Sequence, residues 1–217
     1  MKVGVLFSGG KDSCLALHKF GIEKIDCLLS LIPENLDSFM FHKPDLKLLK
    51  KQAEMLGKKL IIKKTSGKEN LELKDLESLI KKSKVNKLVI GGIKSCYQGE
   101  RIKKICFELG VEVIAPLWNY GEDKLWGELL KNNFKVIITK IASEGISKDF
   151  LGKIIDEKTL EKLKKLAQKY KFRLDFEGGE AETSVLFMPG FSKEIRVSGA
   201  MESEGDYRHF LKLKEVF

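Results

Sequence analysis

The chain has 217 residues, of which 43% are hydrophobic and 33% are charged, so it is long enough to bury the core of one large or two small domains. No apolar run reaches the roughly 18–20 residues that a membrane span needs, and the N-terminus has no basic region followed by a long apolar one, so we expect a cytoplasmic protein. The net charge of +9 does not favour a nucleic-acid partner, because only four of the 40 basic residues are Arg and the lysines lie beside glutamates on expected helices.

The first half of the chain alternates apolar runs with amphipathic stretches. The apolar runs predict strands at residues 3–7, 25–32, 60–62, 88–90 and 111–114. The amphipathic stretches predict helices at residues 15–20, 46–56, 71–83 and 102–109. Asp45 can cap the second helix, while Gly57 and Gly110 end the second and fourth. This alternation predicts right-handed βαβ units and an α/β fold, with a Rossmann-like, mostly parallel sheet that binds ligands at the carboxyl ends of its strands.

The alternation weakens after Pro116. We expect helices at residues 121–131 and 157–170, and strands at residues 136–141, 172–176, 183–187 and 194–197. Strands in succession with few helices are typical of α+β folds. The chain is therefore predicted to form two domains, residues 1–116 and a smaller α+β domain at residues 117–217.

The four cysteines contain no Cys-x-x-Cys pair, which disfavours a zinc ribbon or an iron–sulfur cluster. Cys14 and Cys106 fall in expected helices among apolar neighbours, so buried free thiols are the favoured interpretation for all four. A persulfide relay between Cys96 and Cys106 is the alternative.

Residues 8–13 read Ser-Gly-Gly-Lys-Asp-Ser and join the first expected strand to the first expected helix. Glycines let backbone N–H groups close on an anion, and the N-terminus of the helix adds further donors. Lys11 supplies a cation, whereas Asp12 suits a phosphate site only if a magnesium ion lies between the carboxylate and the phosphate. The predicted phosphate-binding residues are Ser8, Gly9, Gly10, Lys11, Asp12 and Ser13.

Two common phosphate-binding motifs do not fit this stretch. In a Walker A loop Gly4 and Gly9 would be correctly spaced, but Gly10 occupies the lysine position, and the Gly-x-Gly-x-x-Gly dinucleotide fingerprint is absent. A capped strand-to-helix turn explains the glycines and one serine but leaves Lys11 and Asp12 unexplained.

Residues 8–13 match the Ser-Gly-Gly-x-Asp-Ser hallmark of the PP-loop ATP pyrophosphatases of the N-type, a group that the chain therefore resembles. The resemblance implies ATP and Mg²⁺ as cofactors and an ATP-binding domain at residues 1–116. It also implies attack of a substrate oxygen on the α-phosphorus, an adenylated intermediate, and release of AMP and pyrophosphate. Lys11 and Asp12 are then catalytic residues, and Asp12 holds the metal ion.

Four further segments narrow the resemblance to the archaeal type of the diphthine–ammonia ligase (diphthamide synthase) family. They are residues 92–98 with Arg101, residues 116–118, residues 151–156, and residues 177–183, which read Glu-Gly-Gly-Glu-Ala-Glu-Thr. The first resembles the family's second ATP-side loop and implies further ATP-binding residues: Gly92, Ser95, Tyr97, Gln98 and Arg101. Three positions depart from the family's usual pattern, because Lys153 replaces Arg, Phe176 replaces Gly and Ala181 replaces an aromatic residue.

Residues 177–183 place three glutamates within six positions, and their glycine pair allows a tight turn. If the chain after the turn is extended, Glu180 and Glu182 point to one face, where clustered carboxylates favour a metal ion, an ammonium ion or a basic substrate group. A polar hairpin turn is the alternative interpretation. The resemblance implies a substrate-binding domain at residues 117–217, with catalytic Glu177, Glu180 and Glu182 and with substrate contacts from His42, Gly178, Gly179 and Thr183.

The reaction implied by the resemblance is ATP-dependent amidation of diphthine on translation elongation factor 2. Free ammonium is the expected nitrogen donor, because the chain shows no separate glutaminase-like domain. Two alternatives stay open: a PP-loop enzyme that thiolates or aminates a tRNA base, and a non-catalytic ATP-binding regulatory module. The expected partners are elongation factor 2 carrying diphthine and ammonium, with no membrane and no nucleic acid. A homodimer, an acidic protein partner and an RNA partner stay open.

Overall fold

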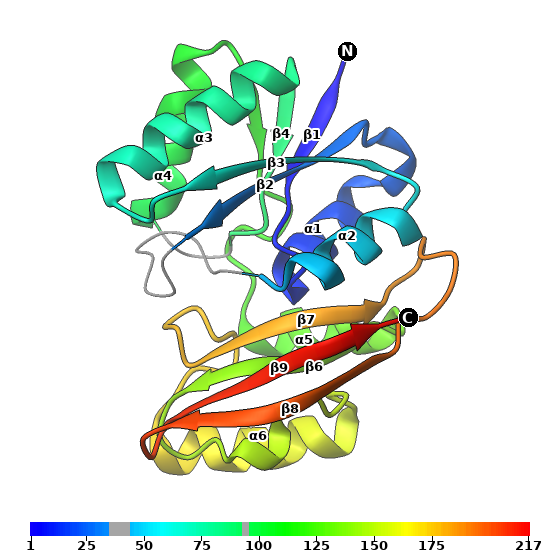
Figure 1. The fold of residues 1–217 in the computed structure, drawn as a ribbon, viewed down its shortest axis with the longest axis vertical. Coiled ribbons are helices and arrows are strands. Elements are labelled where there is room, and N and C mark those ends of the chain that lie inside the picture. The colour runs from blue at the N-terminus through cyan, green and yellow to red at the C-terminus, as the bar shows by residue number, and fades with distance from the viewer. Residues whose placement is uncertain (35–43, 93–95) are drawn as a thin grey trace. The chain divides into compact units, whose positions relative to one another are not determined.

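The computed structural model describes residues 1–34, 44–92 and 96–217, and for residues 69–70 and 96–98 it describes the backbone alone (Figure 1). The chain divides into two compact units, Met1–Asn119 and Tyr120–Phe217. Among the described residues, no helix has both the length and the apolar character that crossing a membrane requires.

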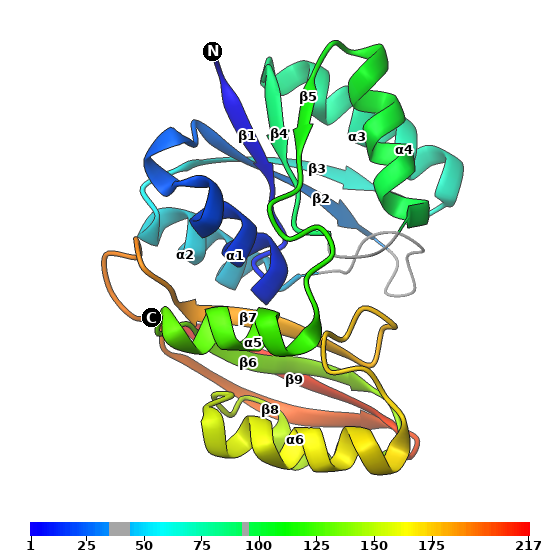
Figure 2. The same ribbon diagram turned by 180° about the vertical axis from the view of Figure 1, so that it is seen from behind.

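The first unit is built on a five-stranded parallel sheet in the order β3-β2-β1-β4-β5. Its strands are β1 (Val3–Leu6), β2 (Cys27–Pro33), β3 (Lys59–Thr65), β4 (Lys87–Val89) and β5 (Glu112–Ile114). Its helices are α1 (Lys11–Phe20), α2 (Leu46–Met55), α3 (Glu69–Ser83) and α4 (Cys96–Glu108), with a short 3₁₀ helix at Ile22–Lys24. Helices α1 and α2 cover one side of the sheet, and α3 and α4 cover the other (Figures 1 and 2). The predicted α/β fold with a Rossmann-like sheet is confirmed.

Every residue of β2 is buried, because helices cover both of its faces. Successive side chains of a strand point to opposite faces, and Cys27, Leu29 and Leu31 join the core that is formed with α3 and α4. That core also receives Leu76 and Leu79 from α3. The continuous apolar run in the sequence therefore marks a central strand.

The strand order places β1 next to β4, at the point where the connections turn from one half of the sheet to the other. Ligands of open parallel sheets bind at this switch point, outside the carboxyl ends of the strands. The chain leaves β1 toward Gly9 and Gly10 and leaves β4 toward Gly91 and Gly92, so both glycine pairs follow these two carboxyl ends.

Helix ends follow the sequence where caps are explicit and differ where polar residues begin a helix. The Asp45 carboxylate accepts hydrogen bonds from the N–H groups of Lys47 (2.8 Å) and Leu48 (2.9 Å), which confirms the predicted cap. However, α1 begins at Lys11 instead of residue 15, and α4 begins at Cys96 instead of residue 102. The apolar periodicity does not reveal where these two helices begin, because the first turn of each helix is polar.

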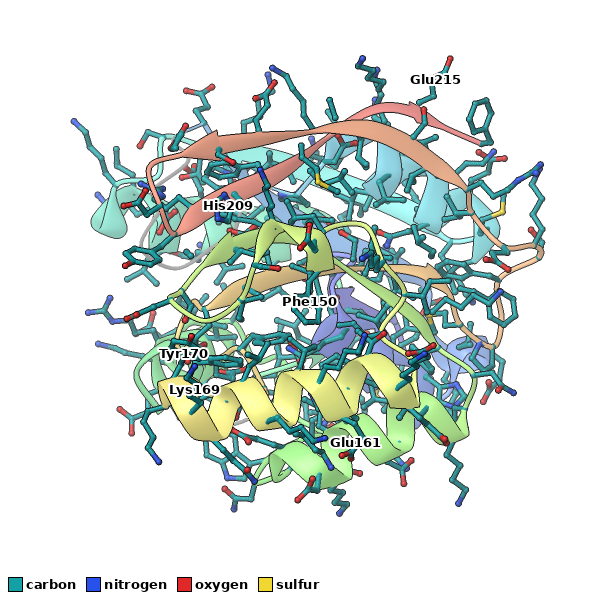
Figure 3. All side chains as sticks on the ribbon, turned by 90° about the horizontal axis from the view of Figure 1, so that it is seen from below. Phe150, Glu161, Lys169, Tyr170, His209 and Glu215 are labelled. Atoms are coloured by element: carbon teal, nitrogen blue, oxygen red, sulfur yellow. The ribbon has the colours of Figure 1, made fainter. Side chains whose placement is uncertain are left out.

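The second unit contains a four-stranded antiparallel sheet in the order β7-β6-β9-β8. Its strands are β6 (Lys135–Ala142), β7 (Ala181–Phe187), β8 (Val197–Glu204) and β9 (Arg208–Val216). Its helices are α5 (Glu122–Lys131) and α6 (Glu157–Tyr170), with a 3₁₀ turn at Lys148–Phe150. Both helices lie on the same side of the sheet, and Figure 3 shows α6 with Glu161 and Lys169 on it. The predicted α+β character is confirmed.

The sequence did not predict the C-terminal hairpin. It predicted a single strand in this region, at residues 194–197. The structure instead has two long strands, β8 and β9, joined by a turn with a left-handed Gly205 (φ 69°). Charged and polar side chains line much of this hairpin and pair across it, as in the ion pair between Lys212 Nζ and Glu202 Oε1 at 3.0 Å. Strands with this much charge carry a weak hydrophobic signal.

The strand predicted at residues 172–176 is wrong. Alternating Phe172, Leu174 and Phe176 suggested it, but the segment forms a loop whose N–H groups bind carboxylates. The Arg173 N–H donates to Glu180 Oε1 at 3.1 Å, and the Leu174 N–H donates to Glu122 Oε1 at 3.2 Å. Because these donors already have side-chain partners, they are not used in a sheet ladder.

Phe176 has a left-handed backbone with φ of 58°, which is rare for a bulky residue. Its side chain is 4% exposed, and its ring packs edge-to-face on Trp126 of α5, with 6.1 Å between ring centroids. The Trp126 indole N–H donates to the Leu174 carbonyl at 2.9 Å. Trp126 therefore holds this loop to the helix layer by packing and by a hydrogen bond.

We expect Phe176→Ala to lower the free energy of unfolding by about 3 kcal/mol, because it removes a buried ring from Trp126. Phe176→Gly removes the same ring but relieves a left-handed backbone, which costs a non-glycine residue about 1 kcal/mol. The glycine variant should therefore be more stable than the alanine variant. Urea unfolding followed by circular dichroism measures both.

Phe187 in β7 is the matched control, since its φ is not left-handed. Glycine in a strand is less stable than alanine by roughly 0.5–1 kcal/mol, so Phe187→Gly should be the less stable variant of that pair. An alanine variant at residue 176 that equals or exceeds the glycine variant would contradict the assigned backbone strain.

Candidate functional site

The turn between β1 and α1 is shaped by its two glycines. Gly9 has φ of +74°, and Gly10 follows as the extended N-cap residue of α1. Gly10 has no side chain, so α1 receives no side-chain cap at this end. The first turn of α1 therefore presents backbone N–H groups and the positive end of the helix dipole, which together form a site for an anion.

The two serines of the loop hold its ends together. Ser13 Oγ donates to the Gly10 carbonyl at 3.1 Å and accepts from the Ser8 N–H at 3.3 Å. The two hydroxyl oxygens lie 3.2 Å apart, and the Gly10 N–H reaches Ser8 Oγ at 3.4 Å. The structure thus brings Ser8, Gly10 and Ser13 together, as a phosphate-binding turn requires.

Lys11 and Asp12 form an ion pair inside this turn. Lys11 is 3% exposed, and its Nζ lies 2.9 Å from Asp12 Oδ2. The other carboxylate oxygen, Asp12 Oδ1, is buried and has no hydrogen-bond partner among the residues that the structure describes. A buried oxygen without a partner is costly, so Asp12 is suited to a ligand that supplies positive charge.

This carboxylate fits a magnesium ion that is shared with phosphate. Within the described ranges, no three His, Cys, Asp or Glu residues gather as a protein-only metal site. Mg²⁺ commonly takes one or two carboxylates together with substrate phosphates and water. Asp12, at the start of α1, is the described residue placed to supply such a carboxylate.

Two residues that the sequence analysis did not select shape the same turn. A Cβ on Gly91 would lie 2.7 Å from both the Asp12 carbonyl carbon and the Ser13 nitrogen, so only glycine allows the end of β4 to approach α1 this closely. Gln52 of α2 is 1% exposed and donates from Nε2 to the Gly9 carbonyl at 2.9 Å. The sequence contains one signal for Gln52, since it is a polar residue at a position where the helical period of α2 predicts a buried apolar one.

The second predicted ATP-side segment is described only in part. Gly92 is exposed, and apart from its chain neighbours no described atom lies within 4 Å of a Cβ built on it, while Arg101 is half-buried in α4. The backbones of Tyr97 and Gln98 lie in the first turn of α4. Ser95 and the predicted substrate residue His42 lie outside the described residues.

In the second unit, Glu180 binds the backbone of its own turn. Its Oε2 accepts from the Gly178 N–H at 2.9 Å and its Oε1 accepts from the Arg173 N–H, while Gly179 is left-handed (φ 85°). The Glu177 N–H donates to Asp175 Oδ1 at 3.1 Å. Part of this acidic segment therefore builds the turn itself.

Glu182 pairs with a lysine across the sheet. Its Oε1 lies 2.8 Å from Lys140 Nζ, and the two residues are register partners on β7 and β6 with 17% and 18% exposed side chains. Lys140 Nζ also lies 5.8 Å from the centroid of the Phe210 ring on β9. Thr183 follows in β7 and pairs with Ile138. The prediction that the glutamates meet an external cation stays a prediction.

Asp175 is a second buried carboxylate that the sequence analysis did not select. It is 1% exposed and contacts Arg173 Nη2 at 2.5 Å. The hydrogen bond to this carboxylate raises the pKa of the Arg173 guanidinium. The pair fixes the loop that precedes Glu177.

Cys14, Cys27 and Cys106 are buried free thiols, as predicted for them. Burial raises the pKa of each thiol, and that of Cys106 reaches about 11. Few thiolates therefore form at neutral pH, which disfavours Cys106 as a sulfur carrier. The side chain of Cys96 lies outside the described part of the chain.

Two family models match the chain. The model "Diphthamide synthase N-terminal domain" matches residues 1–113, and "Diphthamide synthase C-terminal domain" matches residues 122–216. A solved structure from Methanocaldococcus jannaschii, described as a predicted subunit of tRNA methyltransferase, is 18% identical with a TM-score of 0.44 and covers 89% of this chain and 99% of that chain. A likeness at this level supports no statement on fold or function.

Curated relatives agree with the family models. A protein from Bos taurus named diphthine--ammonia ligase is 32% identical over 225 residues, which cover 92% of this chain and 84% of that protein. A protein of the same name from Schizosaccharomyces pombe is 33% identical over 217 residues, which cover 90% of this chain but 36% of that protein. The resemblance inferred from the sequence motifs is confirmed, and the chain belongs to the diphthamide synthase family of ATP-dependent ligases.

Proposed function

We propose that this chain amidates diphthine on translation elongation factor 2, using ATP and ammonium and releasing AMP and pyrophosphate. Membership of the diphthamide synthase family and the names of the curated relatives support the reaction. The observation that carries the ATP chemistry is the buried Asp12 Oδ1, which has no partner within the described part of the chain and lies beside Lys11 in a glycine turn at the carboxyl end of β1. We further propose a cytoplasmic location.

In the proposed first step, the loop binds the β- and γ-phosphates of ATP through its backbone N–H groups and α1. An oxygen of the diphthine carboxylate attacks the α-phosphorus, and the bond from that phosphorus to the bridging oxygen breaks. Its electron pair leaves with pyrophosphate, and a carboxyl adenylate forms. Lys11 stabilises the charge that develops on the leaving group, because its buried ammonium is held at the loop by Asp12.

A magnesium ion bound at Asp12 would neutralise phosphate charge and polarise the bond that breaks. Gly92, Ser95, Tyr97, Gln98 and Arg101 are the proposed remaining ATP contacts. Arg101 is half-buried and its neighbours follow β4, which supports a place near the carboxyl end of the sheet.

In the second step, ammonium loses a proton to water, and the nitrogen lone pair of the resulting ammonia attacks the acyl carbon. The carbon–oxygen bond to AMP breaks with its electron pair on AMP, the nitrogen releases a second proton to water, and the amide remains. We assign Glu177, Glu180 and Glu182 to the substrate side, where carboxylates suit ammonium or the trimethylammonium group of diphthine. Gly178, Gly179, Thr183 and His42 are the proposed substrate contacts. The bonds from Glu180 to backbone N–H groups support a positioning contribution, since they hold the shape of this turn.

The tRNA-thiolating alternative is less well supported. Such chemistry usually needs a reactive thiolate, and burial raises the pKa of Cys106 to about 11. The amidation reaction needs no thiol.

Asp12→Asn should reduce AMP formation by about 100-fold or more, because it removes the charge assigned to metal and phosphate binding. The assay contains elongation factor 2 carrying diphthine, ammonium chloride and MgATP, and chromatography separates AMP from ADP. Full activity of Asp12→Asn would refute the metal assignment, and ADP as the product would refute the adenylation reaction.

Asp75→Asn is the matched control for this variant. The Asp75 side chain is 27% exposed and pairs with Lys63 at 3.2 Å, and the Asp12 side chain has the same exposure and also pairs with a lysine. We expect Asp75→Asn to leave AMP formation unchanged within two-fold, since surface ion pairs contribute little to stability.

The double variant Cys96→Ala/Cys106→Ala should retain amidation activity within about three-fold, because no step of the proposed reaction passes through sulfur. The same assay, normalised to the folded fraction from circular dichroism, measures it. Complete loss of activity in a folded double variant would favour the sulfur-relay alternative.

A further inference from the structure

We propose that Gln52 is a positioning residue of the phosphate loop, which orients the Gly9–Gly10 peptide so that the Gly10 N–H faces the phosphate. This inference rests on the proposed function, because it assumes that the loop binds the β- and γ-phosphates of ATP.

The Gln52 side chain contacts the Gly9–Gly10 peptide group. Its Nε2 donates to the Gly9 carbonyl at 2.9 Å, and a Cβ on Gly9 would lie 2.0 Å from Gln52 Oε1. The amide thus lies so close to Gly9 that only a glycine leaves room for it. Gln52 is 1% exposed, so this contact is shielded from competing water.

Because a trans peptide is planar, the contact with the Gly9 carbonyl also sets the direction of the Gly10 N–H. The peptide group is planar, and the C=O and N–H of one trans peptide point in opposite directions. Because Gln52 holds the Gly9 carbonyl toward α2, the Gly10 N–H points away from α2. Within the described ranges, that N–H makes one long bond of 3.4 Å to Ser8 Oγ, on the exposed side of the loop.

A peptide between two glycines needs an outside contact, such as the hydrogen bond from Gln52, to hold its orientation. Without Cβ atoms both residues reach many backbone conformations, so the Gly9–Gly10 peptide can rotate at low cost. A rotated peptide would present a carbonyl oxygen, instead of an N–H donor, to the phosphate oxygens. Gln52 prevents this rotation, since the Gly9 carbonyl would lose a buried hydrogen bond.

The position of Gln52 in α2 supports a role beyond packing. The buried face of α2 is otherwise apolar, with Leu48, Leu49, Ala53 and Met55. An apolar residue would fill this position at no desolvation cost. Asp45 caps the same helix and fixes its start, about two turns before Gln52.

The test measures binding of inorganic pyrophosphate with MgCl₂, and separately of AMP, by isothermal titration calorimetry on the full chain. Gln52→Met keeps the length of the side chain and removes its donor. We expect its dissociation constant for pyrophosphate to rise about ten-fold, the size of one lost hydrogen bond, while that for AMP changes less than two-fold.

Ser83→Ala is the control for a loss of stability alone. Ser83 is 1% exposed, and its Oγ donates to the Ile80 carbonyl in α3, so the variant also removes a buried side-chain bond to a carbonyl. It should lower the urea midpoint of unfolding without changing either dissociation constant.

The outcomes separate this inference from the proposed function. Wild-type protein that does not bind pyrophosphate overturns the proposed phosphate loop itself. Wild-type protein that binds pyrophosphate, together with Gln52→Met that binds it equally well, overturns the positioning role alone. Equal weakening of pyrophosphate and AMP binding in Gln52→Met also overturns it, because a general distortion would then explain the loss.

Discussion

The candidate ATP site depends on one close backbone contact, where the residue after β4 meets the first turn of α1. Gly91 lies so close to the Asp12 carbonyl carbon and the Ser13 nitrogen that any side chain would collide with backbone atoms. Backbone atoms cannot move aside as a flexible side chain can. The contact therefore fixes the N-terminus of α1 beside the carboxyl ends of β1 and β4, where the strand order reverses direction.

Much of the first unit could be predicted from the sequence, because its central strands are largely buried and its helices are amphipathic. The loop at residues 8–13 was also predictable. A structural turn explains its glycines but does not explain why a lysine and an aspartate follow them. For Gln52 and Gly91 the sequence carries weaker signals, a polar residue among the apolar positions of a helix and a glycine pair after an expected strand, and neither signal identifies the contact. Each acts through a contact with residues about 40 or more positions away in the chain, and that proximity exists only after folding.

The second unit was less predictable for two physical reasons. Its hairpin of β8 and β9 is largely exposed and charged, so cross-strand pairs replace the hydrophobic alternation that marks a strand. The segment at residues 172–176 has the alternation but not the strand, because nearby carboxylates take its N–H donors. Charge on an exposed hairpin hides the first case, and competition for backbone hydrogen bonds explains the second.

The interpretation of the acidic segment at residues 177–183 changes once the partners of its glutamates are known. In the sequence, three glutamates suggest a surplus of negative charge that calls for an outside cation. In the folded unit, Glu182 already faces Lys140, and Glu180 accepts from two backbone N–H groups. The negative charge that a substrate would meet is therefore smaller than the three carboxylates suggest. Where that charge lies depends on whether these internal bonds remain when a substrate binds.

Cys14 lies directly behind the phosphate loop, within α1, and is fully buried. Oxidation of cysteine to sulfenic acid proceeds through the thiolate and requires access for the oxidant. Burial raises the pKa of this thiol, and its side chain is not accessible to solvent. The burial that completes the core therefore also protects a thiol beside the candidate ATP site from oxidation.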